Sequence, residues 1–310
     1  MLSKKAKRCQ STLTWPAFHD DDPCMGYLLT SILCSACITV GFKAMALWRM
    51  KLVWAVPANY LACVLLGVYM THIPAPGKIA AAPWTALALL QGVLLAGNFY
   101  LLAYAAQKVG ISVAALSSRL AVALPVIMGF ILFGDSIDAA KAVGLLASLV
   151  ALYLASTPQK GALTGRSPIP NLAIPALTFF GFGLHFCVLK IAQHFYLSTA
   201  EHHTYVMSAF FFALLTSLVI LWLRREGLFD SLRSILAGLV LGCLNYTALF
   251  TLTRVLSFAS WESSVVFPTY SVGIVVVSSL AAYLIFRELF TSRRLSGLGI
   301  GLAAVILLNV

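Results

Sequence analysis

The chain has 310 residues, of which 61% are hydrophobic and 10% are charged, and its formal net charge is +11. Its mean hydropathy of +0.93 is far above that of a soluble domain, so the composition excludes a soluble globular protein and predicts an integral membrane protein. The positive residues are mostly spread singly along the edges of apolar stretches, which argues against nucleic acid as a partner.

Residues 1–24 precede the first apolar stretch. They begin with basic residues and continue to an acidic run without an apolar segment between them. A signal peptide needs such a segment, so this part of the sequence predicts a disordered N-terminal tail.

Apolar stretches then recur with short breaks to the end of the sequence. Because roughly 20 apolar residues cross about 30 Å of hydrocarbon as a helix, each stretch predicts a membrane span. A β-barrel is excluded, since the stretches are continuously apolar and do not alternate. The ten predicted spans are 25–47, 52–72, 84–107, 110–133, 138–156, 171–195, 203–223, 231–254, 259–286 and 292–310.

The breaks between spans are too short for a folded extramembrane domain, and Pro and Gly mark them as turns. The longest, 157–170, is a linker between two groups of five spans. Most of the seven cysteines lie within spans and form no metal-binding pattern, so we expect neither a metal site nor a cofactor.

An internal repeat relates the two groups of spans. The segment 97–109 aligns with 243–255, pairing Tyr100 with Tyr246, and 138–156 aligns with 291–309. Two shorter matches pair Lys43 with Lys190 and Tyr60 with Tyr205. The four matches occur in the same order, with an offset near 146 for the first three and 153 for the last. The repeat therefore predicts two five-helix halves, 25–156 and 171–310.

An odd number of spans in each half means that the second half enters the membrane from the opposite side. Inverted repeats of this kind are typical of secondary transporters, which bind a solute near the middle of the bilayer and expose it to each side in turn. The repeat thus predicts ten helices around a central cavity.

The sequence also resembles a known family. The stretch 106–156, with "FGD" after its fourth span, resembles the repeat of the EamA-like family of the drug/metabolite transporter (DMT) superfamily, and 263–309, with "FRE", resembles its second copy. Asp135 stands where the family usually has Glu, and Arg287 where it usually has Gly. The resemblance implies a secondary active transporter, often an exporter, of small organic solutes such as amino acids, metabolites or drugs, in the bacterial inner membrane.

The orientation of the chain has two conflicting indications. Basic residues are more numerous in the loops after odd-numbered spans, and the positive-inside rule therefore places those loops in the cytoplasm and both termini outside. The resemblance implies the reverse, because characterised members of the superfamily generally have cytoplasmic termini. The sequence leaves both orientations open.

Arg119 is the most unusual residue of the spans. It lies within "AALSSRLAVALPVIMGFILF" (114–133), about nine residues from the start of its span, 110–133, which is roughly 14 Å of helix and close to the middle of the bilayer. A charge at this depth needs a partner or water. We expect it to bind a substrate carboxylate or phosphate; a structural ion pair or a contact with free helix carbonyls are the alternatives.

Two residues are candidates for proton coupling. Glu262 aligns with Leu116, one turn from Arg119, so the pseudo-axis could bring both charges into one cavity. A carboxylate in a partly desolvated site exchanges protons near neutral pH. Glu262 is alternatively an interfacial helix cap, and His185, deeper in its span, is alternatively a hydrogen-bonded packing residue.

The remaining candidates for substrate binding occur in pairs. Lys43 and Lys190 occupy matching places near the ends of their spans, where snorkelling to the interface is the alternative. The third helices of the two halves carry polar residues that would line a cavity or hydrogen-bond between helices, namely Asn98, Tyr100, Asn245 and Tyr246.

A secondary transporter is therefore the leading hypothesis, with proton coupling as an option. A membrane-embedded enzyme and a passive channel are the alternatives, but the sequence has neither a catalytic cluster nor a ring of like residues around a pore. The expected partners are a small-molecule substrate and the lipid bilayer, with the chain a monomer or a weak dimer.

Overall fold

The structure is a computed structural model that describes residues 23–71, 76–108, 111–135, 138–155, 173–198, 200–224, 232–258, 262–287 and 291–308. The predicted tail and the 157–170 linker lie outside these residues, apart from Pro23 and Cys24. All regular structure in the described ranges is helical, which confirms the predicted all-α class. The helices are α1 (Pro23–Leu47), α2 (Leu52–Thr71), α3 (Pro76–Ala80), α4 (Thr85–Lys108), α5 (Ile111–Leu120), α6 (Ala123–Met128), η1 (Gly129–Phe133), α7 (Ala139–Ala155), α8 (Ala173–Phe195), α9 (His202–Arg224), α10 (Leu232–Val255), α11 (Ser263–Phe286) and α12 (Ser292–Leu308).

Helices occupy all ten predicted spans. In the described chain, seven are long and apolar enough to cross a membrane: α1, α2, α4, α8, α9, α10 and α11. Three further apolar stretches, Ser117–Phe133, Ala139–Leu154 and Leu295–Leu308, have the shorter lengths of 10–17 residues. The protein is accordingly a multi-pass α-helical membrane protein. The short helix α3 lies in a connection for which the sequence predicted no helix.

The fourth predicted span is divided into three parts, where the sequence predicted one continuous helix. The α-helical pattern is interrupted at Ala121 and Val122, before Pro125. Proline has no N–H to donate to the residue four positions earlier, and its ring crowds that carbonyl, so a regular helix is disfavoured here. The last part is a π-helix, which ends at Gly134 in the left-handed conformation, with φ 69°.

The ninth span is one helix, α11, although Pro268 lies inside it. Its C-cap, Arg287, is also left-handed, with φ 52° and ψ 36°. A side chain is strained in this region, which glycine adopts freely.

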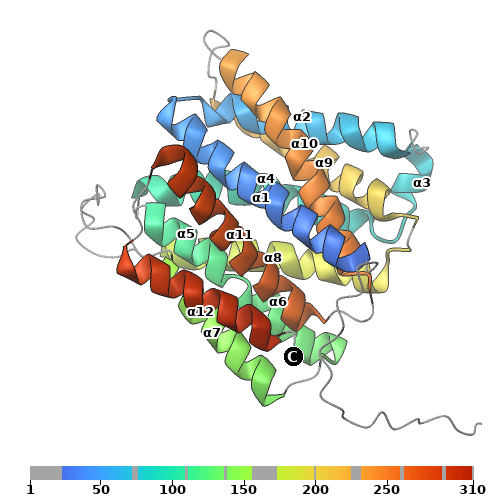
Figure 1. Ribbon diagram of the computed structural model, residues 1–310. Helices are drawn as coiled ribbons and strands as arrows, with labels where there is room; N and C mark the ends of the chain where they lie inside the picture. Colours follow the sequence, from blue (N-terminus) through green and yellow to red (C-terminus); the bar gives the residue numbers. More distant parts are fainter. Residues whose placement is uncertain are drawn as a thin grey trace, which may run out of the picture.

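The helices pack mainly in pairs drawn from different halves of the sequence. Helix α7 lies beside α12 along one edge of the molecule, and α2 packs against α9 and α10 on the other side (Figure 1). Between these edges, α1 packs against α10 and α11, and α4 against α8 and α9, while α8 also contacts α5 and α6.

Glycines allow the closest of these approaches. An added Cβ at Gly92 of α4 would lie 2.6 Å from the carbonyl oxygen of Ala209 on α9, and one at Gly238 of α10 would meet the carbonyl oxygen of Ala55 on α2. Small residues at helix contacts are how helices associate in a bilayer, where lipid tails remove the hydrophobic driving force.

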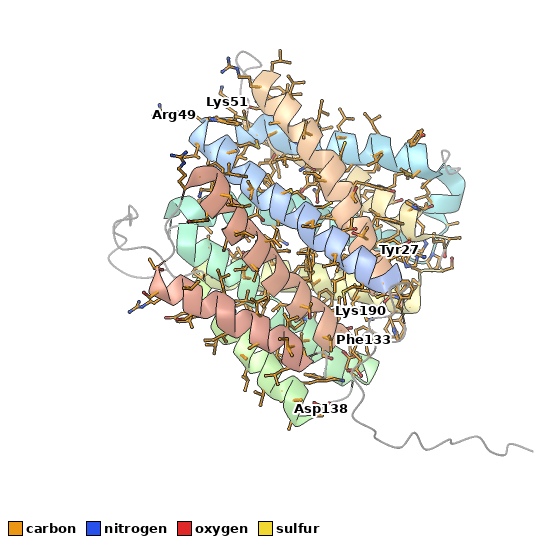
Figure 2. The ribbon with its side chains drawn as sticks, viewed as in Figure 1. Tyr27, Arg49, Lys51, Phe133, Asp138 and Lys190 are labelled. Atoms are coloured by element: carbon orange, nitrogen blue, oxygen red, sulfur yellow. The ribbon has the colours of Figure 1, made fainter. Side chains whose placement is uncertain are left out.

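The bundle has two chemically different ends. Arg49 and Lys51 lie at one end, while Phe133, Asp138 and Lys190 lie toward the other (Figure 2). We call the first the basic end, since its exposed charged side chains among the described residues are Arg49, Lys51, Arg224, Arg233, Arg287 and Arg293. We call the second the acidic end, since all described acidic residues lie there, namely Asp135, Asp138, Glu201 and Glu262.

Candidate functional site

Arg119 lies in the last turn of α5, directly before the break in the fourth span. Its Nη2 donates a hydrogen bond of 3.4 Å to Oγ1 of Thr39 on α1. Among the described residues, Tyr270 of α11 is the one titratable side chain that interacts with it electrostatically, and no carboxylate forms an ion pair with it. The guanidinium therefore lies between helices of both halves, with most of its donor capacity unused by the described residues.

Hydroxyl groups and aromatic rings lie next to Tyr270, the side chain that interacts with Arg119. The hydroxyl of Tyr270 is 2.7 Å from Oγ of Ser35, one turn before Thr39 on α1. The ring of Tyr270 is 6.3 Å from that of Phe186 on α8, which in turn is 5.3 Å from Phe267. A polar group and an apolar group of one small molecule would both find partners here. We call Ser35, Thr39, Arg119, Phe186 and Tyr270 the Arg119 site.

Glu262 pairs with a lysine that the sequence analysis did not name. Its Oε2 accepts a 2.6 Å salt bridge from Nζ of Lys141 in the first turn of α7, and the two side chains are 31% and 17% exposed. Glu262 is the N-cap residue of α11, eight positions before Tyr270, and eight residues of helix span about 12 Å. The structure therefore places Glu262 at the acidic end and Arg119 deeper in the bundle.

Asp135 lies at the acidic end, and the sequence analysis did not name it as a candidate site residue. Its Oδ2 accepts the backbone N–H of Ser264 at 2.9 Å, so it satisfies one of the free donors at the start of α11. It also lies near Lys190, to which it is electrostatically attracted. The "FGD" sequence after the fourth span was its only signal.

The paired lysines lie at opposite ends of the bundle, each over a phenylalanine ring. Nζ of Lys43 is 4.5 Å from the ring centroid of Phe286, at the basic end. Nζ of Lys190 is 5.4 Å from the ring centroid of Phe133, at the acidic end, and donates to the carbonyl oxygen of Leu256 at 3.3 Å. We call these two contacts the Lys–Phe contacts.

Three of the four polar residues on the third helices form hydrogen bonds between helices. Asn98 donates to the carbonyl oxygen of Gly181 on α8 at 2.8 Å, and Asn245 to Oδ1 of Asn59 on α2 at 3.0 Å. The hydroxyl of Tyr246 is 2.9 Å from Nδ1 of His203. The Tyr100 hydroxyl is buried without a hydrogen-bond partner among the described residues. The alternative of interhelical hydrogen bonding thus accounts for three of them.

His185 is buried and lies 2.9 Å, through Nδ1, from Nε2 of Gln91 on α4. Gln91 is fully buried, and its Oε1 has no hydrogen-bond partner among the described residues. The sequence analysis missed Gln91, because a lone glutamine in an apolar span carries no repeat or motif signal. His185 therefore has the partner that a packing role requires, and its part in proton coupling stays a prediction.

Glu201 lies in the turn before α9, outside the spans. Hydrogen bonds from the Ser198 hydroxyl and from the indole N–H of Trp84 hold the pKa of its carboxyl below the ordinary value of 4.5. The Trp84 bond, 3.0 Å long, joins the turn to the start of α4. This carboxylate thus links two connections at the acidic end.

Two apolar grooves of about 360 and 230 Å³ lie elsewhere, one formed by α5, α6, α7 and α8 and the other by α1 and α11. Neither is lined by Arg119, so the predicted central cavity stays a prediction. No three His, Cys, Asp or Glu side chains of the described residues gather into a group that could hold a metal ion.

Comparisons with known proteins agree on the fold and leave the function open. No family model matches the sequence. The chain is 23% identical over 290 residues to an uncharacterized protein of Haemophilus influenzae, in an alignment that covers 91% of this chain and 96% of that relative. A solved structure described only as the crystal structure of a protein is similar with a TM-score of 0.72 and 15% identity, over 92% of this chain and 96% of the other. Over 92% of its length, the chain therefore has a fold that occurs in a solved protein.

Proposed function

We propose that the protein is a secondary active transporter of small organic solutes, built from two inverted five-helix repeats and working by alternating access. In this proposal it belongs with the EamA-like transporters that its sequence resembles, acts as an exporter and lies in the bacterial inner membrane. The geometry supports this function through contacts that recur at equivalent positions of the two halves.

The Lys–Phe contacts carry the proposal. Lys43 and Lys190 differ by 147 positions, and Phe133 and Phe286 by 153, which are the offsets of the sequence repeat within one residue. The left-handed residues that follow the two rings, Gly134 and Arg287, also differ by 153. Each contact joins the first helix of one half to the fourth span of the other. A two-fold relation between the halves explains both contacts together.

The close glycine contacts support the same relation. Gly92 and Gly238 differ by 146 positions, and each approaches a carbonyl oxygen of the second helix of the other half. Those oxygens belong to Ala209 and Ala55, which differ by 154. The sequence match of Tyr60 with Tyr205 has an offset of 145. The glycine contacts therefore favour an alignment of α2 with α9 that is shifted by nine residues from that match.

The contacts between helices are also equivalent when the two halves are interchanged. The contact of α1 with α10 corresponds to that of α8 with α4, the contact of α2 with α10 to that of α9 with α4, and the contact of α1 with α11 to that of α8 with α5 and α6. Halves joined by such exchangeable contacts can rock against each other, so that a site between them opens to each side in turn.

Reconstitution into liposomes tests the proposal. A transporter should exchange a labelled solute across the membrane at a saturable rate, and a pH gradient should drive its accumulation if protons are coupled. An enzyme would yield a chemically changed product, and a channel would conduct without saturation or accumulation. Either of those results, obtained across a panel of amino acids and organic acids, would refute the transporter.

A further inference from the structure

We infer that the solute held at the Arg119 site is an organic monocarboxylate with an apolar body. This inference rests on the proposed transport function and deepens it by naming the chemical class of the substrate. It comes from the charge, the hydrogen-bonding capacity and the apolar surroundings of one position.

The charge at the site is a single positive one. Arg119 is permanently cationic, and the one titratable side chain of the described residues that interacts with it is a tyrosine. A cationic solute would meet an unopposed like charge, and a dianion would bring one negative charge too many. A monoanion leaves the site neutral, which a low-dielectric interior strongly favours.

The hydrogen-bonding groups match a carboxylate. A guanidinium presents its N–H donors as a planar fork that fits two carboxylate oxygens at once. Arg119 donates to Thr39 over 3.4 Å, which is long for a charged donor, so a carboxylate would be a better acceptor than the partner present. The Tyr270 hydroxyl, 2.7 Å from Oγ of Ser35, belongs to the side chain that interacts with Arg119.

The apolar part of the solute is indicated by the rings. The ring of Phe186 on α8 meets that of Tyr270 on α11 edge to face, at 83°, and is tilted by 57° against that of Phe267. Phe267 is fully buried, and Phe186 is partly exposed. An alkyl or aryl group next to the carboxylate would cover the exposed part of the Phe186 side chain, whereas a small inorganic anion would not.

Thermal stability of the purified protein in detergent tests the inference with matched probes. We would compare phenylacetate, hexanoate and N-acetylphenylalanine with their neutral amides. We expect at least one carboxylate to raise the Tm and its amide to leave the Tm unchanged. Amides that act as well as the acids, or a panel in which no carboxylate acts, would overturn the inference.

Variants then locate the effect. Arg119→Gln should weaken binding of that carboxylate at least about tenfold, since a charged hydrogen-bonding partner is lost, and Arg119→Lys should weaken it less. Arg254→Gln is the matched control, because Arg254 lies within α10 and contacts Tyr27 away from the site. Unchanged binding in Arg119→Gln would refute the assignment. If this variant does not fold, the comparison of acid with amide in the wild type decides.

Flux separates this inference from the proposed function. Proteoliposomes that transport neutral solutes and carboxylates equally well would overturn the carboxylate assignment and leave the transporter standing. A carboxylate that binds through Arg119 but never crosses the membrane would refute the transporter and leave the binding assignment standing.

Discussion

Two residues of this bundle share an unusual backbone conformation, but only one of them has a side chain that it strains. Gly134 and Arg287 follow the fourth spans of the two halves, and both adopt the left-handed conformation. Only the first is a glycine. The backbone strain at Arg287 is therefore present in one half only, and the glycine at the equivalent position of the other half shows that glycine would relieve it.

We predict that Arg287→Gly stabilises the protein by about 1 kcal/mol, because glycine adopts the left-handed region without the steric cost of a Cβ. Chemical unfolding in detergent measures the change. Arg287→Ala serves as the control: it removes the charge and keeps the Cβ, so it should give no comparable gain. Gly134→Ala should destabilise by a similar amount, and equal stability of all four proteins would contradict the explanation.

A second residue-scale prediction concerns Glu201, whose hydrogen bonds lower its pKa below 4.5. Because the folded state holds the charged form more strongly than the unfolded state does, this carboxylate contributes stability above the ordinary pKa, and the contribution is lost as the pH falls through the lowered pKa. Wild type should be more stable than Glu201→Gln at neutral pH, and the two should converge as the pH falls below 4.5 and through the lowered pKa. Parallel stability curves over that range would contradict the assignment, and Ser198→Ala should reduce the difference.

The two Lys–Phe contacts join helices at opposite ends of the bundle. One joins α1 to α11, and the other joins α8 to the π-helical segment η1. In the proposed alternating-access cycle, the halves must separate at one end while they stay together at the other. The two contacts are placed to hold the ends closed in turn. In that cycle Lys43 and Lys190 would be gate residues at the bundle ends, and the substrate-binding role that the sequence predicted for them stays a prediction.

This role predicts opposite effects for Phe133→Leu and Phe286→Leu. Each should favour opening at its own end by about 2- to 30-fold, since a cation–π contact contributes about 0.5–2 kcal/mol. The measurement is the reaction of Thr39→Cys, in a protein without other cysteines, with an impermeant thiol reagent applied from each side. Phe180→Leu is the control, because Phe180 of α8 is exposed and has no cation over its ring among the described contacts. Shifts toward the same side in both variants would contradict the gate.

The division of the fourth span marks the limit of sequence reasoning at the scale of elements. Hydropathy and length located the spans, since both depend on local composition alone. They did not predict the break before Pro125, because a proline inside a membrane helix is compatible with a continuous helix, as Pro268 in α11 demonstrates. Which of the two outcomes occurs depends on neighbouring helices, and these are not visible in the local sequence.

Across the whole molecule, the repeat paired Lys43 with Lys190 in the sequence, and the structure adds the ring that each one contacts. The partner of Glu262 was not predictable in the same way. Lys141 lies 121 positions away from Glu262. In the repeat, Lys141 corresponds to Arg294, but Glu262 corresponds to Leu116, which cannot form an ion pair. The pair joins the two halves and has no repeated counterpart, so it leaves no repeat signal, and the packing of α7 against α11 reveals it.

The unequal ends of the bundle lead to a prediction of its orientation. Six exposed basic side chains lie at one end, and every described acidic residue lies at the other. Basic residues in short loops are retained in the cytoplasm during insertion. We therefore expect the basic end to face the cytoplasm, with the starts of α1 and α7 and the end of α12 on the outer side.

Labelling of single cysteines in intact cells measures this orientation. In a protein without other cysteines, Ala139→Cys at the start of α7 should react with an impermeant maleimide from outside, while Ser292→Cys at the start of α12 should react only after lysis; both positions are exposed. Replacing Arg224, Arg233, Arg287 and Arg293 with glutamine should weaken the preference, because it removes four of the six exposed basic side chains described at that end. The reverse labelling pattern would place the basic end outside, as the family resemblance implies, and would show that the loop charges do not decide the orientation of this chain.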